Sequence, residues 1–233
     1  PFGFQRRPRW PLTLITPLSV ISHRRRSDER CMPSTKKKRR RQRAKNRRFD
    51  PARTASNELE QTVDEAIAAA AKHQLAGRYT LAAGLYAHVL SVAPQHPDAW
   101  HLAGVLAYQQ GDHPKALEFI SHAIELAPDR AHFYINLSNV YCALRQPKKA
   151  IEACRVALRM TPESPLAWSN LGNAHRDLGD LGQATKFYRI ATEHDPKFYD
   201  AHINLGTVLL HQNRTKKAEQ SFRAALAIDS ERF

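Results

Sequence analysis

The chain has 233 residues, 25% of them charged, and a formal net charge of +14. Residues 1–50 hold 17 Lys and Arg against 3 Asp and Glu, a net of +14, whereas residues 51–233 hold 19 of each. The pI near 10 therefore describes a basic N-terminal segment and excludes a strongly basic folded surface. The three cysteines, Cys31, Cys142 and Cys154, match neither a disulfide framework nor a metal-binding spacing.

Residues 1–31 contain one apolar run, Pro11–Ile21. The run is about half the ~20 residues that a membrane-spanning helix needs. It also fits a signal peptide poorly, because Arg24–Arg26 stand where small residues would mark cleavage. Met32 is the first methionine, so we expect it to be the natural start and residues 1–31 to be an untranslated or disordered leader.

Residues 32–56 are expected to form a disordered basic arm and a linker. Ten of the thirteen residues in Lys36–Arg48 are basic and none is acidic. Such a block repels itself and buries no apolar surface, so it should stay disordered and bind nucleic acid or anionic surfaces weakly. The expected polyanion-binding residues are Lys36, Lys37, Lys38, Arg39, Arg40, Arg41, Arg43, Lys45, Arg47 and Arg48.

From residue 57 to residue 233 the sequence repeats every 34 residues. The period carries an alanine through Ala82, Ala116, Ala150, Ala184 and Ala218. It carries a proline through Pro94, Pro128, Pro162 and Pro196. A fixed period in this range is typical of stacked repeats. A capping box at Asn57 and Glu60 predicts where the first helix begins. Helix–turn–helix units are expected near 63–96, 97–130, 131–164, 165–198 and 199–233, with turns at Gly77, Gly111, Arg145, Gly179 and Asn213.

Within each unit a small residue is predicted to face a large one. In the fourth unit Trp168, Leu171, Gly172 and His175 share one helical face, and Gly172 is expected to lie against the second helix, which carries Tyr188. The equivalents of Gly172 are all small: Ala70, Gly104, Ser138 and Gly206. The equivalents of Tyr188 are Tyr86, Ile120, Cys154 and Phe222, so Cys154 is interpreted as a core residue.

The pattern of Trp-Leu-Gly first helices, Ala-aromatic-Ala second helices and a closing proline resembles the tetratricopeptide repeat. The resemblance covers roughly residues 62–233 and is weakest in the first unit, where Ala66, Ala69 and Ala70 replace the signature residues. It implies an all-α fold, a right-handed superhelical solenoid of about five units. It also implies a concave wall that is lined by the first helix of each unit.

Amide side chains recur at one register of that expected wall. An Asn amide can pair with both the C=O and the N–H of a peptide backbone, so a ladder of them could hold an extended polypeptide. The alternative, which stays open, is that the asparagines satisfy neighbouring helix turns or face water. The expected peptide-binding residues are Asn136, Asn139, Asn170, Asn173, Asn204 and Thr207.

The Asn-Leu-Gly-Asn pattern resembles the repeat region of O-linked N-acetylglucosamine transferases, where the family implies that asparagines guide substrate polypeptides. We therefore expect a scaffold for protein–protein interaction. One alternative is the substrate-recognition part of such a glycosyltransferase whose catalytic domain is absent. Another is an adaptor that the basic arm tethers to a polyanion. Tetratricopeptide domains that clamp the C-terminal carboxylates of chaperones carry Lys one residue before the ladder position. Here that position holds Ile67, His101, Ile135, Ser169 and Ile203. A clamp of this kind is therefore not expected.

Catalytic and metal-binding spacings are not found in the sequence. The sharpest candidate cluster is His96, His101 and His132, which is interpreted as groove-lining or surface histidines rather than as ligands. The chain is therefore predicted not to be an enzyme and to need no cofactor. Its expected location is the cytoplasm, or the nucleus if the source is eukaryotic.

Overall fold

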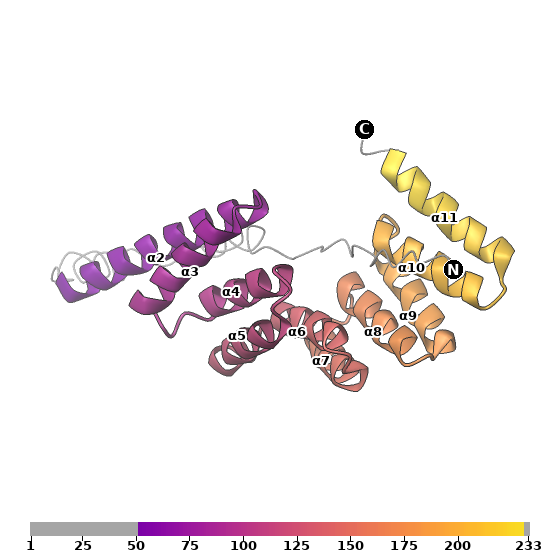
Figure 1. The fold of residues 1–233 in the computed structure, drawn as a ribbon, viewed down its shortest axis with the longest axis horizontal. Coiled ribbons are helices and arrows are strands. Elements are labelled where there is room, and N and C mark those ends of the chain that lie inside the picture. Colours follow the sequence, from indigo (N-terminus) through magenta and orange to yellow (C-terminus); the bar gives the residue numbers. More distant parts are fainter. Residues whose placement is uncertain (1–50, 231–233) are drawn as a thin grey trace, which may run out of the picture. The chain divides into compact units, whose positions relative to one another are not determined.

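A computed structural model describes residues 51–230, with side chains described from Glu60 to Asp229. This part of the chain contains ten helices and no strand (Figure 1), which confirms the predicted all-α fold. The helices are α2 (Pro51–Leu75), α3 (Tyr79–Val92), α4 (Pro97–Gln109), α5 (His113–Leu126), α6 (Ala131–Ala143), α7 (Pro147–Met160), α8 (Pro165–Asp177), α9 (Leu181–His194), α10 (Tyr199–His211) and α11 (Thr215–Ser230). They form two compact units, α2 with α3 and α4 through α11.

The five predicted turns join the two helices of each pair. A residue with positive φ stands in each of them: Gly77, Gly111, Arg145, Gly179 and Asn213. The next residue then donates its backbone N–H to a carbonyl five positions earlier, as in Asp180 N to His175 O at 2.9 Å. This closure satisfies carbonyls that the helix end would leave free. It explains why glycine or asparagine stands at four of the five positions.

The starts of the first helices are also fixed locally. Ser164 Oγ accepts a hydrogen bond from Ala167 N at 3.3 Å, which caps α8. Trp168 on the same helix donates its indole N–H to Pro162 O at 2.7 Å. The equivalent Trp100 makes the same bond to Pro94 O at 2.7 Å. These bonds hold the proline that ends one pair against the helix that begins the next.

Helix α2 begins at Pro51 rather than at Asn57. Residues 51–56, which were predicted to belong to the linker, are therefore helical. Proline suits the first helical position because its missing N–H has no acceptor there. The Ala and Arg residues that follow also favour a helix. The predicted basic arm and leader lie outside the described residues.

In the α4–α11 unit, three glycines of the first helices lie directly against a large residue of the second helix of the same pair. A Cβ on Gly104 would lie 2.7 Å from Ile120 Cγ1, and one on Gly206 would lie 2.6 Å from Phe222 Cε1. Gly172 stands in the same relation to Tyr188. The predicted packing is confirmed at these three positions, and the absence of a side chain lets the helices of a pair approach closely.

The α2–α3 pair has its own small core. Tyr86 and Val89 of α3 are each 1% exposed. They pack on α2, where Ala70 occupies the position that Gly172 has in the fourth unit. The Tyr86 hydroxyl donates to Gln74 Oε1 at 2.8 Å. Burial would be costly for a phenol without a partner, so the Gln74 side chain completes this core.

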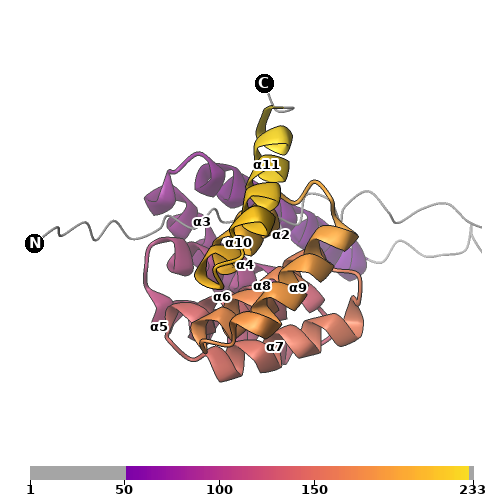
Figure 2. The ribbon, with the colours of Figure 1, turned by 90° about the vertical axis from the view of Figure 1, so that its right-hand side faces the viewer.

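The helix pairs from α4 to α11 stack in chain order into an α-solenoid. One buried cluster illustrates the continuity, because it takes Ala107 from α4, Ile120 from α5, Val140 from α6 and Ala153 from α7. Among the first helices, α4 contacts α6 and α6 contacts α8. Viewed end-on in Figure 2, α5 and α7 lie outside α4 and α6. The first helices α4, α6 and α8 therefore lie next to one another on the inner side of the stack.

Candidate functional site

The predicted peptide-binding residues stand on three successive first helices. Asn136 and Asn139 belong to α6, whereas Asn170 and Asn173 belong to α8. Residues 204 and 207, an asparagine and a threonine, belong to α10. Because the units repeat every 34 residues, the members of each register occupy equivalent places on the first helices. The structure thus brings the predicted residues onto one face, which we call the first-helix face.

Two of the amides are bonded to the preceding pair of helices. Asn170 is 8% exposed, and its Nδ2 donates to Ile135 O at 3.2 Å and to Ser138 Oγ at 3.1 Å. Asn136 is 5% exposed, and its Nδ2 lies 2.8 Å from His101 Nε2. Each amide therefore ties its own helix to the first helix before it. The Asn170 bond to Ile135 O is the role that the alternative gave the asparagines, which was to satisfy a neighbouring helix turn. Both amides use their Nδ2 hydrogens rather than their Oδ1 oxygens.

The protonation state of His101 follows from this contact and from the burial of the ring. An amide nitrogen can only donate, so Nε2 is the acceptor and the ring proton lies on Nδ1, which has no hydrogen-bond partner among the described residues. The ring is 1% exposed, stacks on Phe133 at 4.4 Å between centroids and meets the edge of His132 at 5.1 Å. Burial first, and His132 second, hold the pKa of His101 well below its usual value. The imidazole is therefore neutral.

The predicted residues of the C-terminal half are more accessible. Asn173 and Asn204 are half-buried. Asn173 Oδ1 accepts from the Tyr188 hydroxyl at 2.7 Å and from Asn204 Nδ2 at 3.5 Å. Thr207 Oγ1 donates to Ile203 O at 2.9 Å. On α8 it is therefore Asn173, rather than Asn170, whose Oδ1 accepts these hydrogen bonds.

Asn139 differs from the other predicted residues. It is half-buried, and no hydrogen bond of its side chain is found within the described residues. Its amide therefore keeps both its donor and its acceptor for an incoming group. Asn136 and Asn170 keep their Oδ1 atoms, since their bonds use Nδ2. Binding of a polypeptide by these six residues stays a prediction.

The register one residue earlier carries no cation in α4–α11. His101 is neutral, Ile135 and Ser169 are buried, and Ile203 is half-buried. A carboxylate clamp needs a charged donor at this place. The structure therefore offers no group for such a clamp at this register of α4–α11.

The three candidate histidines do not converge on one site. His96 caps α4, since its Nδ1 accepts from Ala99 N at 3.3 Å. His132 is half-buried, and its pKa is lowered mainly by burial. In the range from Glu60 to Asp229, no cluster of three or more His, Cys, Asp or Glu side chains has an arrangement that could hold a metal ion. The histidines act in helix capping and in packing between pairs.

Cys142 and Cys154 are free thiols. Cys154 is fully buried, as predicted, at the position that Tyr86, Ile120, Tyr188 and Phe222 hold in the other units. Burial raises the pKa of both thiols to about 12, so they are protonated near neutral pH and unreactive as nucleophiles.

The ten predicted polyanion-binding residues of the arm lie outside the described residues. None of the described helices is long and apolar enough to cross a membrane.

A family model matches most of the chain. The model described as "Cilia and flagella-associated protein 70 C-terminal domain", a tetratricopeptide-repeat domain, matches residues 39–231. A comparison with curated protein sequences gave no match. The matched range takes in every helix of the described region.

Solved structures share the fold at low sequence identity. TTC0263, a thermophilic TPR protein of Thermus thermophilus, has a TM-score of 0.65 and 20% identity over 71% of this chain and 90% of its own. PilF of Pseudomonas aeruginosa has a TM-score of 0.67 and 15% identity over 73% and 78%. YrrB, described as a TPR protein with an unusual peptide-binding site, has a TM-score of 0.55 and 20% identity over 73% and 91%. These likenesses concern the fold.

Proposed function

Because the chain belongs to the tetratricopeptide-repeat family of the cilia and flagella-associated protein 70 C-terminal domain, we propose that it is an interaction scaffold that holds an extended polypeptide on its first-helix face. The observation that carries the proposal is the recurrence of amide side chains at equivalent places on α6, α8 and α10. Asparagine is a mediocre residue inside a helix. Its repetition at one register is therefore better explained by a shared role than by helix formation.

The bonds between helix pairs support binding rather than compete with it. Asn136 and Asn170 are fixed by their Nδ2 atoms, so little rotamer freedom remains to be lost when a ligand arrives. Their Oδ1 atoms would accept backbone N–H groups of the bound chain. Asn139, whose side chain has no hydrogen bond within the described residues, would supply both a donor and an acceptor. Each such bond contributes about 0.5–1.5 kcal/mol net, so several must act together.

Charge on this face gives the bound chain no strong preference for acidic or basic sequence. On α8 Arg176 pairs with its neighbour Asp177 at 3.2 Å, so these two charges largely cancel. The register before the ladder carries no Lys or Arg. Recognition through main-chain groups should therefore tolerate many side chains and depend only weakly on salt.

The test uses a double substitution that spares the bonds between helix pairs. Asn139→Ala with Asn204→Ala removes two amides whose loss costs little stability, since Asn204 makes only a 3.5 Å bond to Asn173. The matched control replaces two exposed amides of the second helices, Gln183→Ala with Gln220→Ala. Binding is measured by fluorescence anisotropy of labelled, unstructured peptides, about 15 residues long, selected from an array on the unaltered chain.

We expect the first double variant to bind at least about tenfold more weakly, because two bonds of about 0.7 kcal/mol each are lost. The control should bind like the unaltered chain. Circular dichroism at 222 nm verifies that both variants remain helical. Equal affinity of both double variants for the selected peptides would rule out the ladder.

A second candidate function rests on the resemblance of the Asn-Leu-Gly-Asn register to protein glycosyltransferase repeats. In that case the same face would guide a substrate polypeptide towards a catalytic domain on the same polypeptide. Reading the coding sequence past Phe233 tests this directly. A stop codon immediately after Phe233 would remove the candidate, whereas a downstream glycosyltransferase domain would establish it.

A further inference from the structure

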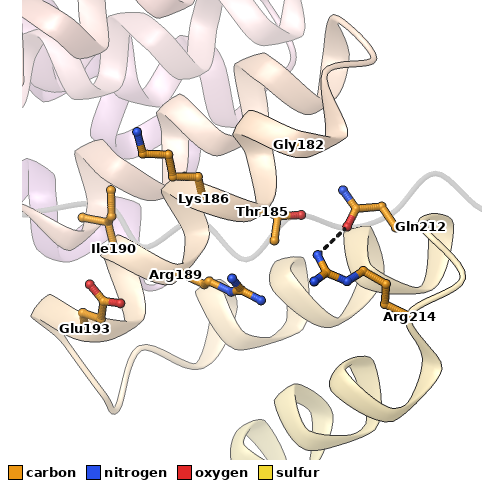
Figure 3. Close-up of a pocket in the computed structure, with 8 residues that line it drawn as sticks. All are labelled: Gly182, Thr185, Lys186, Arg189, Ile190, Glu193, Gln212 and Arg214. Atoms are coloured by element: carbon orange, nitrogen blue, oxygen red, sulfur yellow. Dashed lines mark hydrogen bonds between the residues drawn. The ribbon is translucent and has the colours of Figure 1, made fainter.

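A separate cavity lies between α9 and the loop from α10 to α11. Its volume is about 290 Å³. It is lined by Gly182, Thr185, Lys186, Arg189, Ile190, Glu193, Gln212 and Arg214 (Figure 3). None of these residues belongs to the predicted ladder, so the cavity is distinct from the six predicted peptide-binding residues.

Two guanidinium groups meet in this cavity from different elements. Arg189 comes from α9 and Arg214 from the loop before α11, and Figure 3 shows their guanidinium groups turned toward each other. Within the described residues neither forms an ion pair with a carboxylate, whereas Arg223 on α11 is paired with Glu219 at 2.7 Å. Facing cations that are not paired with a carboxylate repel each other, and an anion between them would relieve that repulsion.

The loop arginine is held in place by side-chain bonds. Gln212 Nε2 donates to Leu181 O of α9 at 2.8 Å, which ties the loop to the start of that helix. Arg214 Nη1 in turn donates to Gln212 Oε1 at 3.5 Å. Thr185, which is 4% exposed and bonded to the same Leu181 O at 2.8 Å, forms the wall beside them. The Gln212 bond therefore fixes the loop that carries Arg214 to the start of α9, the helix that carries Arg189.

The charge of the cavity suits a dianion. Lys186, Arg189 and Arg214 stand against Glu193 alone, a net of +2. In Figure 3 Glu193 lies at the far end of the cavity from the two guanidinium groups. A planar guanidinium donates two parallel hydrogen bonds to phosphate oxygens. We propose that this cavity binds a phosphate monoester, carried either by a phosphorylated side chain of a partner protein or by a small phosphate.

The test titrates the full chain, labelled with ¹⁵N, with inorganic phosphate and with blocked phosphoserine, N-acetyl-phosphoserine amide, while amide shifts are followed by NMR. The site variant is Arg189→Gln with Arg214→Gln, which keeps much of the side-chain bulk and removes both charges. The control is Arg155→Gln with Arg159→Gln, two exposed arginines of α7. Resolving the shifts by residue separates the cavity from any binding by the basic N-terminal segment.

We expect saturable shifts at Thr185, Arg189 and Gln212, unchanged in the control and weakened about a hundredfold in the site variant, that is, about tenfold for each charged donor removed. Tighter binding of blocked phosphoserine than of phosphate would indicate a protein-borne ligand, and equal binding would indicate a free phosphate. Shifts that do not saturate, or that persist in the site variant, would overturn the proposal. Equal affinity for N-acetyl-aspartate amide or for a short oligothymidylate would overturn the choice of a monoester.

Discussion

Replacing Gly172 by alanine should weaken the solenoid by forcing a side chain into Tyr188. A Cβ at this position would lie 2.7 Å from both Cδ1 and Cε1 of the ring and 3.0 Å from Cζ. Carbon atoms in contact normally stay about 3.5–4.0 Å apart, so the ring or the helix must move by about an ångström. The ring cannot turn away easily, because it is fully buried and its hydroxyl donates to Asn173 at 2.7 Å.

The magnitude follows from two opposing effects. Overfilling a packed core costs about 1–3 kcal/mol, and alanine in place of glycine inside a helix returns about 0.8–1 kcal/mol. Three ring atoms are overlapped, so the cost should fall in the upper half of its range. The expected result is a loss of about 1–2 kcal/mol. The matched control is Gly84→Ala in the middle of α3, where an added Cβ meets nothing within 4 Å and stability should rise by about 0.5–1 kcal/mol.

Urea unfolding followed by circular dichroism at 222 nm measures both variants. A double-mutant cycle with Tyr188→Leu adds a second reading, because a smaller partner should absorb part of the cost of the Gly172→Ala change. If Gly172→Ala stabilised the chain as Gly84→Ala does, the close approach of α8 and α9 at this position would be refuted. The same holds if the two substitutions in the cycle were simply additive.

Three other predictions concern the turns, acidity and the basic arm. Arg145 has φ of 60°, so Arg145→Gly should raise stability by about 1 kcal/mol and Gly179→Ala should lower it by a similar amount in thermal unfolding. The folded-state pKa of His101 is lowered from 6.5, so the unfolded chain takes up the proton first; stability should be full above pH 6.5 and fall as the pH drops below it. In urea unfolding between about pH 7.5 and 5, His101→Leu should flatten this slope. Deleting Lys36–Arg48 should abolish nucleic-acid binding. In the intact chain the affinity should fall with salt, by up to about 0.9 log units per log unit of salt for each phosphate contacted. An affinity that does not change with salt in a filter-binding assay would contradict this.

The fold could be predicted from the sequence because its determinants are local and recur. Arg145 shows this well. Nothing in its chemistry favours positive φ, yet its distance of 34 residues from Gly111 and from Gly179 predicted a turn there, and the backbone has that φ. The pairing of Gly172 with Tyr188 could be predicted for the same reason, since helical spacing determines which residues share a face. The start of α2 was predicted wrongly at Asn57, because a local capping signal competed with an earlier proline that also suits a helix start.

The use made of each asparagine could not be predicted in this way. Asn136 and Asn170 occupy one register, yet the first meets an imidazole and the second meets a carbonyl and a hydroxyl. Those partners stand 32 to 35 residues away in the sequence. Only the stacking of one pair on the next decides which polar groups come within hydrogen-bonding distance of an amide.

The cavity at Arg189 and Arg214 shows the same division. Neither residue stands in a motif, and they come together through the packing of α10 on α9 and the Gln212 bond that ties the loop to α9. The sequence alone determined helices, turns and buried faces, since these depend on short-range sterics and on a spacing that repeats. The tertiary structure decided hydrogen-bond partners and facing charges, since these depend on distances between segments that the spacing does not specify.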